Sequence, residues 1–102
     1  MSNKQYIVSY DIAEPKRLRK IASIMEGYGY RIQYSVFLCY LTPVKLEHLK
    51  TDILSIINHN EDQCLIIDIG PGNEMPASIT SLGKPIPKIP QLTIFLIFLF
   101  FT

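Results

Sequence analysis

The order in which two apolar periodicities alternate along the chain restricts its fold more than any other feature. Residues 5–12 alternate with the period of a strand, and apolar residues recur with the period of a helix over 15–28. An extended run follows over 30–41, then a second helical pattern over 43–57 and a short apolar strand over 64–69. This order predicts an α+β fold of the ferredoxin-like βαββαβ type, with two helices on one face of the sheet.

Local signals indicate where these elements begin and divide. Pro15 and Pro43 each stand at the first position of a helix, where the missing proline N–H has no intrahelical partner to lose. The run 30–41 is long for a single strand. A tight hairpin near Tyr34–Ser35 would divide it into two antiparallel strands.

The chain is long enough for one domain with a small core. Its 102 residues are 48% apolar and 19% charged, which is typical of a folded protein. Because two helices can cover only one face of the sheet, we expect a second copy of the chain to cover the other, in a homodimer.

The two ends of the chain carry further expectations. We predict a ferredoxin-like domain over residues 1–91 and an apolar tail over 92–102, which forms an additional C-terminal strand and pairs with the partner copy. The tail is about half the roughly 20 residues that a membrane-spanning helix needs, so no membrane contact is expected. The polar start and the two isolated cysteines indicate a cytoplasmic protein with reduced thiols.

Asp11 stands at the carboxyl end of the first strand. One interpretation is a turn aspartate that accepts hydrogen bonds from nearby backbone N–H groups. The other is a ligand of Mg²⁺, an ion that prefers carboxylate oxygens. A single carboxylate is a poor site, whereas two copies of Asp11 related by a two-fold axis would form a plausible one.

A basic cluster follows in the opening turns of the first helix. The net charge of the chain is only +1, but four of its ten basic residues stand within five positions: Lys16, Arg17, Arg19 and Lys20. A run of this kind is often a solvated helix face. Cations beside the free N–H groups of a helix start also form a phosphate site, and both interpretations stay open.

Arg31 and Phe37 fall on one side of the extended run, together with polar residues. An arginine there can hold a phosphate. A phenylalanine on a polar strand face can stack on a base or fill a dimer interface.

Three motifs together resemble the CRISPR-associated Cas-two (Cas2) proteins. They are Tyr6-Ile-Val-Ser-Tyr-Asp-Ile12, Lys16-Arg-Leu-Arg-Lys-Ile21 and Gly29-Tyr-Arg-Ile-Gln-Tyr-Ser-Val-Phe37. The resemblance implies a ferredoxin-like homodimer in which Asp11 is the catalytic, metal-associated residue. It also implies that Arg17, Arg19, Arg31 and Phe37 are positions that contact nucleic acid.

The same resemblance implies a function in the spacer-acquisition step of CRISPR antiviral defence. The expected activity is Mg²⁺-dependent endonuclease cleavage of RNA or DNA, with a CRISPR integrase subunit as a further partner. A non-catalytic scaffold that binds DNA within the integration complex is an alternative. A toxin-type ribonuclease of the same fold is another.

Overall fold

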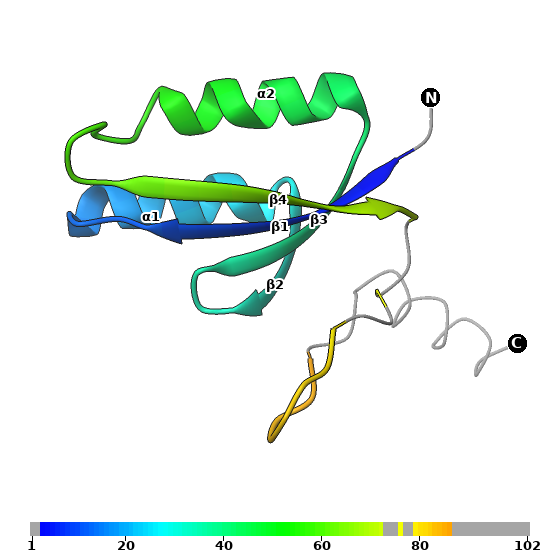
Figure 1. The fold of residues 1–102 in the computed structure, drawn as a ribbon. Helices are drawn as coiled ribbons and strands as arrows, with labels where there is room; N and C mark the ends of the chain where they lie inside the picture. The colour runs from blue at the N-terminus through cyan, green and yellow to red at the C-terminus, as the bar shows by residue number, and fades with distance from the viewer. Residues whose placement is uncertain (1–2, 73–75, 77–78, 87–102) are drawn as a thin grey trace, which may run out of the picture.

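The computed structural model describes residues 3–72, 76 and 79–86, and its elements follow the predicted order (Figure 1). The four strands form one sheet in the order β2-β3-β1-β4, and each neighbouring pair is antiparallel. The α+β, ferredoxin-like prediction is therefore confirmed. Along the chain the elements are β1 (Lys4–Asp11), α1 (Pro15–Glu26), β2 (Gly29–Gln33), β3 (Val36–Leu41), α2 (Pro43–Leu54) and β4 (Gln63–Pro71).

Both helices begin where the prolines predict. At α1 the N-cap is Glu14, whose carboxylate accepts hydrogen bonds from two backbone N–H groups of the first turn at 2.8 and 2.9 Å. At α2 the hydroxyl of Thr42 accepts one from the Lys45 N–H at 3.2 Å. A threonine cap of this kind stabilises a helix by about 1 kcal/mol.

The predicted hairpin is present, with Tyr34–Ser35 as its turn. Gln33 pairs with Val36 across the turn, and the register of β2 shifts by one residue just before that pair. At the far end of the hairpin, a Cβ atom on Gly29 would lie 2.5 Å from Cys39 Sγ. Only glycine fits so close to the neighbouring strand.

The core lies between one face of the sheet and the two helices. Tyr6, Val8 and Tyr10 share one face of β1, and all three are buried there. Alternate residues of the central strands point to this face and meet the apolar stripes of α1 and α2. The remaining buried members of this cluster are Ile21, Met25, Phe37, Cys39, Leu41, Leu49 and Ile53.

The opposite face of the sheet carries apolar side chains that neither α1 nor α2 covers. Leu65 and Ile67 of β4 are about half exposed, at 48% and 47%. Ile7 of β1 and residues 79–82 and 84–86 are among those that line a pocket of about 550 Å³ on this side. The predicted tail, 92–102, lies outside the described residues. Within residues 3–72, neither helix has the length and apolarity to cross a bilayer.

Candidate nucleic-acid and metal site

Asp11 is the last residue of β1 and lies opposite Gln63, the first residue of β4. Its side chain is exposed. Among the acidic residues in 3–72, it is the one whose carboxylate takes part in no hydrogen bond or ion pair. The interpretation of Asp11 as a turn aspartate that bonds local N–H groups is therefore wrong.

The other described carboxylates are already engaged. Three of them surround Arg17, and the rest pair with a lysine, an arginine or a tyrosine elsewhere in the fold. The pairs are Glu14, Glu61 and Asp62 with Arg17, Glu26 with Arg31, Glu47 with Lys50, Asp52 with Tyr28, and Asp68 with Lys4. Of all the described carboxylates, Asp11 is therefore the one with no hydrogen bond or ion pair to either oxygen, so both oxygens are available to a metal ion.

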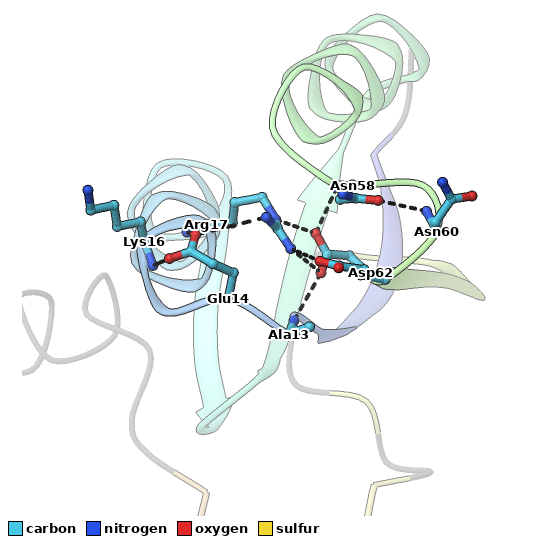
Figure 2. Close-up of polar contacts among 8 residues, drawn as sticks. Ala13, Glu14, Lys16, Arg17, Asn58, Asn60 and Asp62 are labelled. Carbon is cyan, nitrogen blue, oxygen red and sulfur yellow. Dashed lines mark hydrogen bonds and ion pairs between the residues drawn. The ribbon is translucent and has the colours of Figure 1, made fainter.

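Arg17 is held in an acidic cluster that joins α1 to the loop before β4 (Figure 2). Its Nε lies 2.7 Å from Asp62 Oδ2, and one Nη lies 3.2 Å from Asp62 Oδ1 and 2.9 Å from Glu61 Oε2. The Asp62 side chain is fully buried, while that of Arg17 is 22% exposed. Hydrogen bonds from Arg17 hold the pKa of Asp62 well below its usual range, and the bonds to Asp62 in turn raise the pKa of Arg17.

This arrangement differs from the prediction that Arg17 contacts nucleic acid. Its guanidinium is directed at carboxylates on the protein, and little of it reaches solvent. The sequence does contain a feature that indicates this pairing: Glu61 and Asp62 are two adjacent acidic residues in the polar loop that precedes the last strand. An acidic pair of this kind can form ion pairs with a cation of the basic cluster on the first helix.

The other three members of the basic cluster are exposed on α1. Lys16, Arg19 and Lys20 form no ion pair with any described residue. Figure 2 shows the Lys16 side chain extending away from Asp62. These cations stay available to an anion, and their exposure fits both the solvated helix face and the phosphate site that the sequence left open.

Arg19 and Arg31 come together at a pocket of about 370 Å³ between α1 and the hairpin turn. Tyr10 and Tyr34 also line it. The Tyr10 hydroxyl donates to the Tyr34 carbonyl at 3.5 Å, and burial raises the pKa of Tyr10. Arg31 lies 3.6 Å from Glu26 and remains 41% exposed in its side chain. Two cations and the exposed ring of Tyr34 at one pocket suit a nucleotide phosphate and its base, while the Tyr10 ring belongs to the core.

Phe37 corrects the sequence interpretation. It is 0% exposed, so it is not available to stack on a base. The prediction was right that Arg31 and Phe37 share a face, since they pair across the hairpin and the guanidinium lies 5.2 Å from the ring. That face is polar at the edge strand β2, but on the central strand β3 it is covered by the helices. The exposed aromatic of the hairpin is Tyr34, at 74%, a residue of the turn to which the sequence assigned no contact with nucleic acid.

The described residues of one chain supply only some of the ligands that a metal ion needs. Residues 3–72, 76 and 79–86 contain no group of three or more His, Cys, Asp or Glu side chains placed to hold one. The exposed, unengaged Asp11 carboxylate is nevertheless the type of ligand that Mg²⁺ prefers. Such a ligand fits a magnesium site that is completed by a second copy of the chain.

Comparison with known proteins shows the family to which the chain belongs. The model of the family described as CRISPR associated protein Cas2 matches residues 4–75. The chain belongs to this family. A curated Cas2 relative from Geobacter sulfurreducens, named CRISPR-associated endoribonuclease Cas2, is 39% identical over 84 residues, which cover 82% of this chain and 88% of that protein.

Further proteins are similar to this chain in sequence and in structure. A protein of Thermus thermophilus named CRISPR-associated endonuclease Cas2 2 is 30% identical over 92% of this chain and 99% of its own length. A crystal structure of a hypothetical protein from the same species superposes with a TM-score of 0.72 at 31% identity, covering 84% of this chain and 99% of that one. The crystal structure of Streptococcus pyogenes Cas2 at pH 6.5 gives 0.62 at 28% identity, covering 78% and 99%.

Proposed function

We propose that this Cas2 chain is a Mg²⁺-dependent endonuclease that cleaves RNA or DNA phosphodiester bonds in the spacer-acquisition step of CRISPR defence. The observation that carries the proposal is the exposed Asp11 carboxylate, the one described acid left without a partner. The names of the relatives, endoribonuclease and endonuclease, support the same reaction class. A CRISPR integrase subunit is the expected partner in that step.

Each side chain has a separate task in this proposal. Asp11 from each of two copies would hold Mg²⁺, which when bound supplies a Lewis acid for the scissile phosphate and an activated water. Arg19 and Arg31 bind and orient the phosphate backbone from the pocket that they share. Tyr34 presents an exposed ring at the same pocket, where a base can stack.

The homodimer that the two-carboxylate site requires is supported by the open face of the sheet. Leu65 and Ile67 are half exposed there, and no described helix covers them. Apolar side chains on an uncovered sheet face are typical of an interface between subunits. Burial against a second copy would remove this surface from water and bring two sheets together.

A second function, a DNA-binding scaffold without catalysis, is favoured by a specific observation. Lys16, Arg19 and Lys20 lie exposed on one helix with no acidic partner among the described residues, which suits binding to a phosphate backbone. A scaffold needs these cations but does not need the carboxylate of Asp11.

The test compares wild type, Asp11→Asn and a matched control, Asp68→Asn. Asp68 is also an exposed β-strand aspartate, but it is bonded to Lys4 and to the Gly70 N–H. With Mg²⁺ titrated against short RNA and duplex DNA, Asp11→Asn should lower the cleavage rate about 100-fold or more while Asp68→Asn keeps it. Undiminished cleavage by Asp11→Asn would refute the proposed site. Binding without cleavage by all three proteins would establish the scaffold.

A further inference from the structure

We propose that Asp62 is a positioning residue for Asp11, and that Arg17 serves the site through Asp62 and not through contact with nucleic acid. The inference rests on the proposed function in one respect, that Asp11 is the residue whose placement matters. Its evidence is the acidic cluster of Figure 2, in which Asp62 accepts a hydrogen bond from Ala13, two residues after Asp11.

The placement of Asp62 follows from the sheet register. The β1–β4 ladder ends at the pair Asp11 and Gln63. Asp62 is the loop residue immediately before Gln63, so it lies one residue beyond the last pair of the ladder. Its Oδ1 accepts a hydrogen bond from the Ala13 N–H at 2.9 Å, two residues after Asp11. The side chain of Asp62 thus continues the connection between the two strands past the last backbone pair.

Hydrogen bonds donated by backbone N–H groups fix the chain just before and just after Asp11. Before it, the Tyr10 N–H donates to the Ser35 carbonyl at 3.1 Å. After it, the Ala13 N–H donates to Asp62. A carboxylate whose chain is fixed on both sides loses little freedom when it binds an ion. Removing the second of these bonds leaves the turn from Asp11 to the helix free to move.

Asp62 itself is held by four donors, two on each oxygen. Oδ1 accepts from Ala13 N–H and an Arg17 Nη, and Oδ2 accepts from Arg17 Nε at 2.7 Å and from the Asn58 N–H at 2.7 Å. These donors come from the β1–α1 turn, from α1 and from the loop that follows α2. One fully buried side chain therefore fixes three segments relative to one another.

The surroundings of Arg17 argue against a bound phosphate. Its guanidinium faces three carboxylates: those of Asp62, of Glu61 at 2.9 Å and of Glu14 at 4.0 Å. A phosphate brought to this position would meet like charge. Turning the guanidinium toward solvent would leave the buried Asp62 carboxylate without its cation.

The experiment compares Arg17→Lys, Arg17→Gln and Asp62→Asn with Arg19→Gln, and uses Glu47→Gln as a control that removes one exposed, ion-paired carboxylate on α2. Lysine keeps the charge of Arg17 but loses its fixed fork of donors. Asparagine keeps the shape of Asp62 but places an NH₂ group against donors. For each variant the saturating cleavage rate, the slope of log affinity against log salt, and the hydrogen exchange of the Ala13 amide are measured.

We expect Arg17→Lys and Asp62→Asn to lower the saturating cleavage rate about 10- to 100-fold. We also expect both variants to speed exchange of the Ala13 amide about tenfold. Arg17→Gln should keep the wild-type salt slope, while Arg19→Gln should reduce it by about 1. Glu47→Gln should match wild type in all three measurements. If Asp62→Asn does not fold, Arg17→Lys decides the cleavage and exchange measurements.

The proposal is overturned if Arg17→Lys cleaves like wild type while Arg17→Gln loses as much salt slope as Arg19→Gln, because Arg17 would then be a phosphate contact. It is also overturned if Ala13 exchange is unchanged in Asp62→Asn. If wild type cleaves nothing at any Mg²⁺ concentration, the proposed function fails. The salt slope and the exchange of Ala13 still decide whether Arg17 and Asp62 hold the strand end.

Discussion

Replacing Phe37 separates the two roles that an aromatic residue can have at this position. The ring is 0% exposed, 6.2 Å from the Tyr10 ring and 5.2 Å from the Arg31 guanidinium. A core role requires apolar volume, whereas a base-stacking role requires an aromatic face in solvent. We therefore expect Phe37→Ala to act on stability and not directly on nucleic-acid binding.

The size of the effect follows from burial. Removing a fully buried phenylalanine costs about 3–5 kcal/mol, since the transfer free energy is lost and a cavity remains. At about 4 °C per kcal/mol, the lower end for a domain of this size, even 3 kcal/mol lowers the melting temperature by roughly 12 °C. The exposed ring of Tyr34, at 74%, is the matched opposite: Tyr34→Ala should stay within about 0.5 kcal/mol of wild type.

The assay pairs thermal melts with fluorescence anisotropy on a short single-stranded RNA. Phe37→Leu, which retains most of the apolar volume, should recover much of the stability and bind like wild type. Tyr34→Ala should melt like wild type but bind about fivefold more weakly, the equivalent of about 1 kcal/mol for one stacked base. The reasoning is refuted if Phe37→Ala melts within a few degrees of wild type and loses binding instead.

Three further outcomes are expected. Light scattering at micromolar concentration should give about twice the 11.7 kDa chain mass, and Ile67→Lys should shift it toward monomer; a monomeric wild type would contradict the two-carboxylate site. Hydrogen bonds from Arg17 lower the pKa of Asp62 in the folded state, so the unfolded chain, with an aspartate pKa of about 3.9, takes up this proton first. The stability advantage of wild type over Asp62→Asn should therefore be full above about pH 5 and shrink as pH falls below about 4 in thermal melts; an advantage that persists at pH 2 would refute this. Burial raises the pKa of Cys39 to about 12 and of Cys64 to about 11, so native protein at pH 8 should resist iodoacetamide until it unfolds, and rapid labelling would show accessible thiols.

Much of the fold could be predicted from the sequence because its determinants are local. The strand predicted over 5–12 is found as Lys4–Asp11, and that over 64–69 as Gln63–Pro71. Periodicity and proline position specify such elements within a few residues. The length of the extended run indicated that a turn divides it, and the hairpin considered near Tyr34–Ser35 is present, but the run has no Gly or Pro that would have located the turn.

The error at Phe37 has a non-local cause. Alternation along one strand tells which residues share a face, but not whether that face is covered at that strand. Strand β3 lies between β2 and β1, so its helix-facing side is buried, while Arg31 on the edge strand β2 reaches solvent on the same side. The order of the strands decides whether a given face is buried or exposed, and that order depends on pairing between segments that are distant in the sequence.

Arg17 illustrates the same limit for charge. Its partner Asp62 is 45 residues away, so no window along the chain contains both. Sequence can show that a helix start is basic, but the neighbours that neutralise one of its cations come from the tertiary fold. The predicted placement of Asp11 at the carboxyl end of the first strand, by contrast, followed from the strand pattern itself.

Helix geometry explains how one basic cluster can serve two purposes. Successive residues of an α-helix are separated by about 100°, so Arg17 points to a different side of α1 from Lys16 and Arg19, while Lys20, three residues later, lies closer to its side. Arg17 meets Glu14, Glu61 and Asp62, and its guanidinium stabilises the turn after Asp11. The cations of Lys16, Arg19 and Lys20 remain exposed, where they can bind phosphate. The net charge of +1 therefore does not describe how the charges of this cluster are distributed. Arg17 is neutralised by carboxylates within the fold, whereas the exposed cations of α1 are available to a polyanion.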